Sequence, residues 1–328
     1  MLGLLLLAAP ALAAPIFSEQ EYQVAFRNWT AKYERSYEVA DFFDRFEAFK
    51  WNVDFVTRHN MGGFSYTVDL NQFADMRNEE FVKVYMGYVP KKAGNINSDL
   101  LLENVTGKIP AEVDWVSKGA VTPIKNQGQC GSCWSFSTTG SLEGSNFLVH
   151  GRLESFSEQQ LVDCAGSYGN QGCNGGLMDD AFKYVKSEGL CLESAYPYTG
   201  QDGTCKASQC SKAVGLSTYE DVPSKKLDSL AAAVAKQPVS VAVDAAGSGW
   251  QLYRGGVYSG GWFGCGTSLD HGVLAVGYGT SSGKAFWKVK NSWGASWGES
   301  GYIRLKKTSG TGAGTCGIAL QASYPTVA

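Results

Sequence analysis

The stretch Gln127–Trp134 reads QGQCGSCW, and the rest of this 328-residue chain is best understood from it. The small residues before Cys133 favour a helix that begins at this cysteine. A thiol with the ordinary pKa of about 8.5 is mostly protonated at neutral pH, but a helix N-terminus and a nearby imidazolium both stabilise the reactive thiolate. We therefore predict that Cys133 is a nucleophile. We also predict that Gln127 and the backbone N–H of Cys133 donate hydrogen bonds to an oxyanion.

The other cysteine of this stretch, Cys130, precedes the predicted helix and suits a structural disulfide. Two alternatives for Cys133 stay open at this point. A cysteine in a secreted chain is most often half of a disulfide. The spacing CGSC is also that of a thioredoxin-like redox pair, although such a pair is expected after a strand in a βαβ unit, which the surrounding sequence does not show.

The chain contains three histidines, and one of them is a candidate for the base that activates the thiol. His59 lies in a segment that we expect to be removed. His150 precedes Gly151 at a predicted helix end, where a surface or capping role is favoured. His271 heads the apolar segment HGVLAVGYG. An isolated histidine is usually structural, but His271 is the only one left to act as a base.

Asn291 follows His271 at a distance of 20 residues, in the segment KNSWGASWG. Its side-chain oxygen can accept a hydrogen bond from the imidazole and fix the ring orientation, and Trp293 can shield that bond from water. Asp270 either tunes the catalytic pair electrostatically or is a solvated surface carboxylate. A nucleophile, a base and an orienting residue for covalent catalysis are therefore present, in this order along the chain.

Taken together, these segments resemble those of papain-type cysteine endopeptidases, most closely the cathepsin L branch, whose cysteine signature and downstream His and Asn are a known pattern. The resemblance covers nearly the whole chain. It implies an α+β, papain-like fold with a helical lobe, a β-barrel-like lobe and an active-site cleft between them. We expect a signal peptide at 1–14, a helical inhibitory pro-segment at 15–108 and the peptidase domain at 109–328. No cofactor or metal is expected.

Composition agrees with a secreted enzyme. The net charge of −3 and the 18% of charged residues give no sign of nucleic-acid or polybasic membrane binding. Nine cysteines leave one odd thiol, which fits four disulfides and a nucleophile. Residues 1–14 contain a short apolar run and the cleavage pattern Ala11-Leu12-Ala13, and this run is too short to span a bilayer. We expect the secretory pathway, with a lysosome or vacuole or the extracellular space as the destination.

The segment from Ile16 to Lys108 has apolar residues at helical spacing, which predicts two amphipathic helices. They are Tyr22, Phe26, Trp29 and Tyr33 in the first helix and Phe42, Phe46, Phe49, Val53 and Val56 in the second. Two patterns resemble pro-segment signatures of cathepsin L-like precursors. The first is Asp41, Arg45, Phe49, Asn52, Val56 and Asn60, with Asp and Val for the usual Glu and Ile; the second is Asp69, Asn71, Phe73 and Asp75, with Asp69 for the usual Gly.

This resemblance implies auto-inhibition by the pro-segment. A helical hairpin is expected to dock on the enzyme while an extended tail occupies the cleft and runs backwards relative to substrate. We expect acid to trigger release, through carboxylates such as Asp75 and Asp41 that lose their charge as pH falls. The linker 91–107 should be exposed, with maturation before the segment Ile109–Trp115. Asn28 and Asn104 each begin a glycosylation sequon.

The two halves of the peptidase domain are expected to differ in secondary structure. Helices are predicted from Cys133 to about Val149, from a capping box at Ser157–Gln160, and from Leu177 to Ser187, with Gly140 and Gly144 permitting close packing of the first. Strands are predicted at Val239–Ala245, His271–Tyr278, Ala285–Asn291 and Tyr302–Lys306. A polymer substrate would then lie across the junction, with Cys133 on one wall and His271 and Asn291 on the other.

The lining of the cleft follows from the resemblance. Gly175 and Gly176 should pair with an extended peptide, while Asp270 and Trp293 flank the site. The S2 pocket, which receives the second residue before the scissile bond (P2), is expected to be apolar. Its residues are Leu177, Met178, Ala242, Leu269 and Gly272, with Gln321 at the base. We expect a preference for Leu, Phe or Val at P2, with some tolerance of polar residues through Gln321.

The resemblance also implies disulfides and partners. The pairs are Cys130–Cys173, Cys164–Cys205 and Cys265–Cys316, and Cys191 and Cys210 lie outside the usual set and are expected to bridge each other. The expected substrates are proteins and peptides. The expected inhibitors are the chain's own pro-segment and cystatin-type proteins. The enzyme is expected to be a monomer. We favour an endopeptidase, because carboxydipeptidase relatives carry a histidine-bearing loop and no histidine is left for one. A non-catalytic homologue of the same fold is the second hypothesis.

Overall fold

The computed structural model describes residues 14–90, 109–261 and 264–328. Residues 1–13 of the predicted signal peptide, the expected linker 91–107 and Asn104 lie outside the described residues. The pro-segment forms α1 (Glu19–Lys32), α2 (Val39–Met61), β1 (Tyr66–Val68) and α3 (Asn78–Tyr85). The helices that follow are α4 (Cys133–His150), α5 (Glu158–Cys164), α6 (Met178–Glu188), α7 (Leu227–Lys236) and α8 (Ser248–Gln251). The remaining strands are β2 (Val113–Asp114), β3 (Leu216–Asp221), β4 (Val239–Val243), β5 (Tyr253–Tyr258), β6 (His271–Ser281), β7 (Lys284–Lys290), β8 (Tyr302–Lys306) and β9 (Ala322–Val327).

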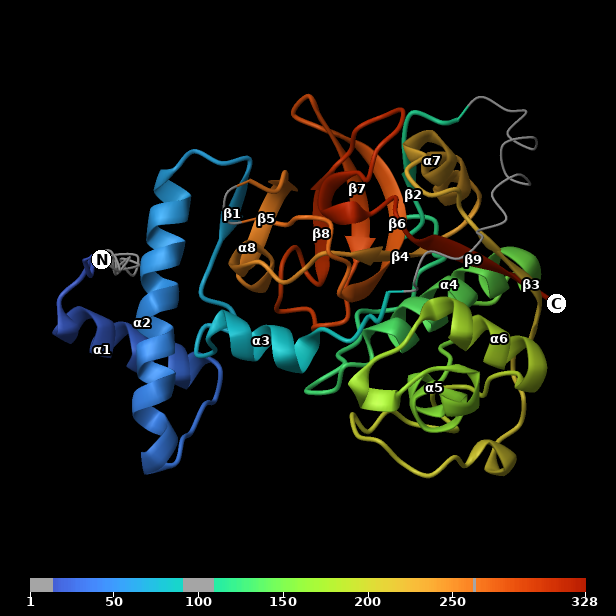
Figure 1. Ribbon diagram of the computed structural model, residues 1–328, viewed down its shortest axis with the longest axis horizontal. Helices are drawn as coiled ribbons and strands as arrows, with labels where there is room; N and C mark the ends of the chain where they lie inside the picture. Colours follow the sequence, from blue (N-terminus) through green and yellow to red (C-terminus); the bar gives the residue numbers. More distant parts are fainter. Residues whose placement is uncertain (1–13, 91–108, 262–263) are drawn as a thin grey trace, which may run out of the picture.

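Helices α1 and α2 lie at one end of the molecule, at the left in Figure 1, where α1 crosses α2 and does not run antiparallel beside it as in the expected hairpin. Phe26, Trp29 and Phe49 are buried between them, as the helical spacing predicted. Phe42 differs from the prediction, because 41% of its surface remains exposed at the start of α2. The amide of Asn52 donates to the carbonyls of Ala74 and Met76 at 2.8 and 2.9 Å. The two pro-segment signatures therefore contact each other.

The sheet has the strand order β1-β5-β8-β7-β6-β4-β9-β3, with β2 paired to β6. Strands β4, β6, β7 and β8 occupy the four predicted positions, whereas β3, β5 and β9 were not predicted. The pro-segment adds its own strand at one edge, where Tyr66 pairs with Gly256. Gly256 has a φ of +95°, and a Cβ there would lie 2.6 Å from the carbonyl oxygen of Ser65. A glycine is therefore required where the pro-segment meets the enzyme's sheet.

The helical lobe is organised by α4, which ends at Gly151 in the left-handed conformation with φ of +71°. A Cβ on Gly140 would lie 2.8 Å from a methyl group of Leu274, and one on Gly144 would lie 2.5 Å from the ring of Pro238. These two glycines therefore let α4 pack against the β-lobe, as predicted. The capping box predicted at α5 is only half formed. Ser157 accepts from the Gln160 N–H, but the Gln160 amide turns away to donate to Tyr184 and Gly189.

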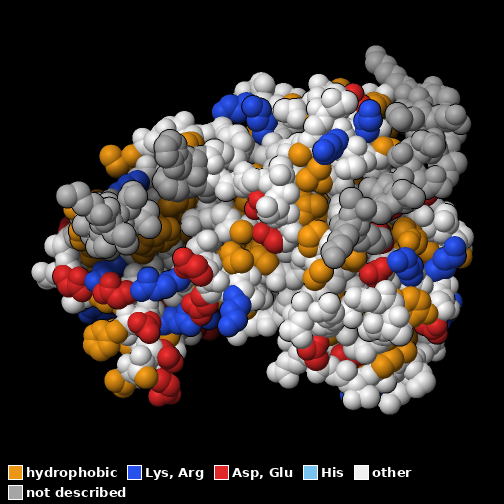
Figure 2. All heavy atoms as spheres, viewed as in Figure 1, with side chains coloured by type: hydrophobic (Ala, Val, Ile, Leu, Met, Phe, Trp, Pro, Cys, Tyr) orange, Lys and Arg blue, Asp and Glu red, His pale blue; other side chains and the backbone are white. Residues whose placement is uncertain are grey.

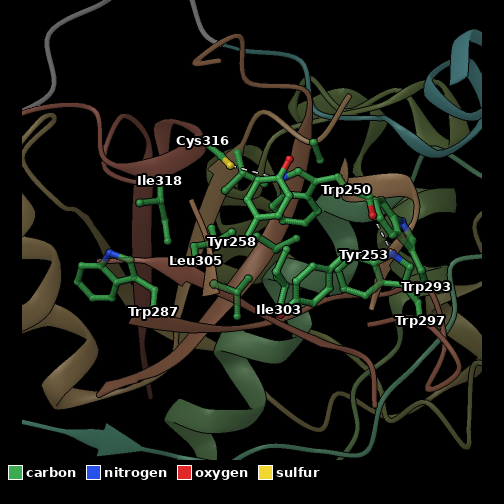
Figure 3. Close-up of a cluster of buried hydrophobic side chains, with 14 of the residues drawn as sticks. Trp250, Tyr253, Tyr258, Trp287, Trp293, Trp297, Ile303, Leu305, Cys316 and Ile318 are labelled. Carbon is green, nitrogen blue, oxygen red and sulfur yellow. Dashed lines mark hydrogen bonds between the residues drawn. The ribbon is translucent and has the colours of Figure 1, made fainter. Parts of the chain in front are cut away.

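Buried aromatic rings fill the core beneath the sheet, and Figure 3 shows the part of it around Trp250. The Trp250 indole N–H donates to Cys316 Sγ at 3.3 Å, and that of Trp297 donates to the Trp250 carbonyl at 3.0 Å. The Trp293 ring lies at right angles to that of Trp297, with centroids 5.0 Å apart. This aromatic cluster supports the site from below, because Trp293 also contacts His271.

Four disulfides connect Cys130 with Cys173, Cys164 with Cys205, Cys191 with Cys210, and Cys265 with Cys316. Each pair is the one that was expected. On the face shown in Figure 2, charged side chains of both signs gather over the pro-segment helices α1 and α2. Within the ranges that the structure describes, no helix is both long enough and apolar enough to cross a membrane.

Candidate active site

Cys133 is the first residue of α4, with Ser132 as the N-cap. Its side chain is fully buried, and it is the one cysteine without a disulfide among the residues that the structure describes. The backbone N–H of Gly272 donates to Cys133 Sγ at 3.3 Å. Because Gly272 directly follows His271, this bond holds the start of β6 against the N-terminus of α4.

His271 is oriented by two residues from the end of β7 and the loop after it. Its Nε2 lies 2.8 Å from the Asn291 side-chain oxygen, so this nitrogen carries the proton and donates. The Trp293 ring stacks on the imidazole with centroids 4.6 Å apart. His271 Nδ1 is buried without a hydrogen-bond partner among the described residues. The orienting and shielding contacts predicted from sequence are both present, and one ring nitrogen remains available for proton transfer.

Gln127 lies in the loop before α4 and is fully buried. The Ser292 hydroxyl donates to its side-chain oxygen at 2.7 Å, which fixes the amide so that its nitrogen points the other way. That nitrogen donates to the carbonyls of Cys130 and Tyr85, both at 3.0 Å. Because Tyr85 belongs to the pro-segment, one of the two hydrogen-bond acceptors of the Gln127 amide is a carbonyl oxygen of the pro-segment.

The pro-segment crosses the site between Tyr85 and Val89. Gly87 O accepts from the Gly176 N–H at 2.8 Å, and the Val89 N–H donates to Gly176 O at 3.2 Å. On the other side, the Tyr88 N–H donates to the carbonyl of Asp270 at 2.9 Å. The bridge between Tyr88 and Gly176 is parallel. These bonds connect the segment to both lobes at once.

The covered site keeps its thiol and imidazole neutral. Burial raises the pKa of the Cys133 thiol to about 12, although the N–H groups of Gly272 and Gly87 lower it. Burial also lowers the pKa of the His271 imidazole to about 4, opposed by the hydrogen bond to Asn291. Both shifts disfavour charge at neutral pH. Burial under the pro-segment therefore disfavours the predicted thiolate–imidazolium pair in the precursor.

Residues 109–326, which contain every group just described on the enzyme side, match the family described as Papain family cysteine protease. The chain belongs to the papain family of cysteine proteases. Residues 26–81 match the Cathepsin propeptide inhibitor domain (I29). The chain is therefore a cysteine-type peptidase made as a zymogen, with an inhibitor domain in its own N-terminal part.

Relatives of this peptidase include precursors from several plants. Cysteine proteinase RD21A of Arabidopsis thaliana is 46% identical over 314 residues, which covers 94% of this chain and 67% of RD21A. Senescence-specific cysteine protease SAG39 of Oryza sativa subsp. japonica is 46% identical over 333 residues, which covers 99% of this chain and 97% of SAG39. The crystal structure of the proform of Amb a 11, a ragweed pollen cysteine protease, is similar with a TM-score of 0.86 and 39% identity, covering 94% of this chain and 95% of that one.

The residues predicted to line the cleft lie together in the peptidase. Met178 and Ala242 are buried in one cluster with Tyr88, and Leu177 and Leu269 pack against it. A Cβ on Gly272 would lie 3.1 Å from Met178 Sδ, so this glycine leaves room for the methionine. Gln321 accepts a hydrogen bond from the Tyr88 hydroxyl. A Cβ on Gly176 would lie 2.8 Å from the Trp134 ring, which excludes other residues there.

Asp270 is not a freely solvated surface carboxylate. It is half-buried, and its carboxylate accepts from the Ala245 N–H at 2.8 Å. Burial raises its pKa to about 7, and the charge of Asp244 adds to this effect. Asp270 also raises the pKa of the Cys133 thiol. An electrostatic influence of Asp270 on the catalytic pair, one of the two alternatives, stays a prediction.

The pro-segment residues that occupy the site were not predicted from the sequence; they are Tyr85, Gly87 and Tyr88. Ser292, which orients Gln127, and Gln251, which binds the pro-segment, were not predicted either. The available signal was the stretch YMGYVP, in which a glycine lies between aromatic residues after the second signature. His150 is exposed at the end of α4 and His59 is buried in the pro-segment, so neither reaches the site.

Proposed function

We propose that the mature peptidase cleaves internal peptide bonds with Cys133 as the nucleophile and His271 as the general base and acid. The thiolate attacks the scissile carbonyl and forms a tetrahedral intermediate. The imidazolium then protonates the leaving amine, which leaves a thioester on Cys133. His271 finally takes a proton from water, which attacks the thioester and regenerates the thiol. Asn291 keeps the imidazole aligned through these steps.

The oxyanion of each intermediate would be held by the Gln127 amide and the Cys133 backbone N–H. The contact that supports this role is the hydrogen bond from Gln127 to the Tyr85 carbonyl, since a carbonyl oxygen already accepts from the same amide in the precursor. Removal of one such donor typically costs about 100- to 1000-fold in kcat. Once the pro-segment has left, water reaches the site and the charged thiolate–imidazolium pair is expected to form.

The observation that carries this proposal is the arrangement of three residues that are distant in sequence. The N–H after His271 binds the Cys133 sulfur, while the same imidazole binds Asn291 and is covered by Trp293. The alternative of a CxxC redox pair is wrong, because Cys130 is bonded to Cys173 and not available to Cys133. A non-catalytic homologue would be expected to lack one of the reacting groups, and this chain retains all of them.

Endopeptidase activity is favoured because His59 and His150, the two other histidines of the chain, both lie outside the cleft. Neither can neutralise a substrate carboxylate there. We propose an apolar S2 pocket with Leu, Phe or Val preferred at P2, from the cluster that contains Met178, Ala242 and Leu269. Kinetics with a dominant preference for Arg at P2 would contradict it.

We propose that the pro-segment inhibits the enzyme by occupying this cleft in the direction opposite to substrate. The parallel bridge at Gly176 supports this orientation. Maturation is proposed before the segment Ile109–Trp115, which would separate the domains at 15–108 and 109–328. The predicted secretory destination, glycosylation at Asn28 and Asn104, a monomeric state and inhibition by cystatins remain proposals from the same resemblance.

Acid activation remains part of the proposal, but Asp75 does not carry it. Burial is the largest influence on Asp75 and raises the pKa of its carboxyl, despite the Tyr37 hydroxyl and nearby arginines. A carboxyl with a raised pKa in the folded pro-segment gains a proton as pH falls and stabilises the docked form. Asp41 is exposed at the start of α2. His59, a buried histidine of the pro-segment, has a lowered pKa, so a fall in pH weakens the docked form through this residue.

The proposed function can be tested with the mature enzyme obtained from the full-length precursor. We expect internal cleavage of peptide-library members and alkylation of Cys133 by iodoacetamide. His271→Ala should abolish turnover, and Gln127→Ala should lower kcat by about 100- to 1000-fold. His150→Ala provides the matched control and should retain activity. Full turnover by His271→Ala, or a mature protein that cleaves no peptide, would rule the proposal out.

A further inference from the structure

The side chain of Tyr88 lies in the pocket proposed to bind the P2 residue. Only 7% of Tyr88 is exposed, and it belongs to the same buried cluster as Met178, Ala242 and Cys133. The backbone of this segment runs parallel at Gly176, so it does not imitate the backbone of a substrate. Only the side chain of Tyr88 therefore indicates which substrate side chains the S2 pocket accepts.

The contact at the base of the pocket is polar. The Tyr88 hydroxyl donates a hydrogen bond to the side-chain oxygen of Gln321. Gln321 is held in place from behind, because its backbone carbonyl accepts from the Ala242 N–H at 3.0 Å. The pocket therefore has apolar walls and an acceptor at its base, at the depth that the hydroxyl of a tyrosine reaches.

Acidic groups surround this base and favour a neutral donor there. Burial raises the pKa of the Tyr88 hydroxyl most, and the charges of Asp179 and Asp221 raise it further, so the hydroxyl remains protonated and donates. Asp179 accepts a hydrogen bond from the Ser323 hydroxyl at 2.7 Å, so its carboxylate is held in place. An acidic P2 side chain would meet repulsion from the same groups.

We propose that, within the apolar class of P2 residues, the S2 pocket prefers tyrosine to phenylalanine, and that Gln321 is the residue that recognises the phenolic hydroxyl. The inference rests on the proposed endopeptidase function and adds the substrate class. Phenylalanine would fill the same apolar walls but would leave the half-buried amide oxygen of Gln321 without this donor. An unmade hydrogen bond of this kind corresponds to about 2- to 10-fold in kcat/KM.

The test compares three substrates that differ only at P2, each with the same arginine at P1 and the same fluorogenic leaving group. The P2 residues are tyrosine, phenylalanine and 4-methoxyphenylalanine, which keeps the ring oxygen but cannot donate. We expect kcat/KM for tyrosine to exceed that for phenylalanine by about 2- to 10-fold, and that for the methoxy compound to fall below tyrosine. The difference in kcat/KM between the tyrosine and phenylalanine substrates should arise mainly from a difference in KM.

Two variants of the mature enzyme show whether Gln321 causes the preference. Gln321→Leu keeps a side chain of similar size without the acceptor, and the ratio of tyrosine to phenylalanine should fall to one or below. Gln209→Leu is the matched control, because Gln209 is exposed on the surface, and it should keep the wild-type ratio. A wild-type ratio of one or less, or a ratio that survives Gln321→Leu, overturns the inference.

The two proposals fail in different ways. If phenylalanine and leucine substrates are cleaved through Cys133 but tyrosine has no advantage, the inference about Gln321 is wrong and the peptidase assignment stands. If none of the substrates is cleaved and Cys133 resists alkylation, the proposed function itself is wrong.

Discussion

At the scale of single residues, the approach of the pro-segment to the catalytic thiol depends on Gly87. A Cβ built on Gly87 would lie 1.8 Å from the carbonyl oxygen of Gly131, a distance that no atom pair tolerates. The N–H of the same residue is among the groups that lower the pKa of the Cys133 thiol. Gly87 therefore allows the backbone to pass directly beside the nucleophile, where any larger residue would be displaced.

We expect Gly87→Ala to weaken auto-inhibition, because the new methyl group forces the segment away from Gly131. The full-length precursor should then react faster with iodoacetamide at Cys133 at neutral pH, by about 5- to 30-fold for a displacement that costs about 1–2 kcal/mol. Gly166→Ala is the matched control, since a Cβ there would meet no atom within 4 Å. Alkylation of Gly87→Ala at the control rate would contradict this role.

At the scale of elements, the short helix α8 connects the pro-segment to the β-lobe through Gln251. Its side-chain nitrogen donates to the carbonyls of Phe73 and Met76 at 3.1 and 3.0 Å, and its side-chain oxygen accepts from Asn78 at 3.1 Å. Its backbone carbonyl also accepts from the Asn71 amide at 2.7 Å. Gln251 is fully buried in the precursor, so these bonds are made without competition from water.

Replacing this glutamine should loosen the pro-segment while leaving Cys133 and His271 in place. In Gln251→Leu, the carbonyls of Phe73 and Met76 lose their donor inside a buried interface, which costs about 1–3 kcal/mol. We expect hydrogen exchange of the backbone N–H groups of α3 to become about 5- to 150-fold faster in the precursor. Gln209→Leu, at an exposed site, should leave this exchange unchanged. Equal exchange in both variants would contradict the proposed contact.

At the scale of the whole molecule, the docked pro-segment contains a histidine whose environment opposes protonation. His59 is 4% exposed and lies between the rings of Phe64 and Tyr66, with centroids 4.4 and 4.5 Å away. Its Nδ1 is buried without a partner among the described residues. Burial lowers the pKa of His59, and the hydrogen bond to the Tyr66 carbonyl opposes this only in part. Tyr66 in turn packs on Tyr258 of the enzyme's sheet.

The sign of this effect agrees with acid activation. A histidine whose pKa is lower in the folded state than its unfolded value of about 6.5 contributes full stability above that pH and loses it as pH falls below. We expect His59→Gln, which cannot be protonated, to shift the pH of half-maximal precursor processing to a lower value. His150→Gln, at an exposed helix end, should leave that pH unchanged. The readout is the processing rate between pH 4 and 7, and an unshifted His59→Gln profile would show that another group carries the trigger.

Much of the fold could be predicted from local patterns. The helical spacing around Phe26 and Phe49 predicted the helices α1 and α2, and the small residues before Cys133 together with Gly151 predicted both ends of α4. The strands that were missed pair with residues far away in sequence: β3 pairs with β9, and β5 with β1 and β8. Apolar and polar residues alternate only weakly in these segments. Their strand conformation therefore depends on pairing with distant strands more than on the local sequence.

The chemistry proposed for the candidate site could be predicted from the sequence alone, because candidates for a nucleophile, a base, an orienting amide and an oxyanion donor are recognised by residue type and by a local helix start. Only the tertiary structure decided which groups cover them. Tyr88 and Gln321 are 233 residues apart, yet they meet at the base of one pocket. Burial by the pro-segment keeps the thiol and the imidazole neutral. Such effects depend on the exclusion of water and on contacts between distant residues, and both exist only once the chain is packed.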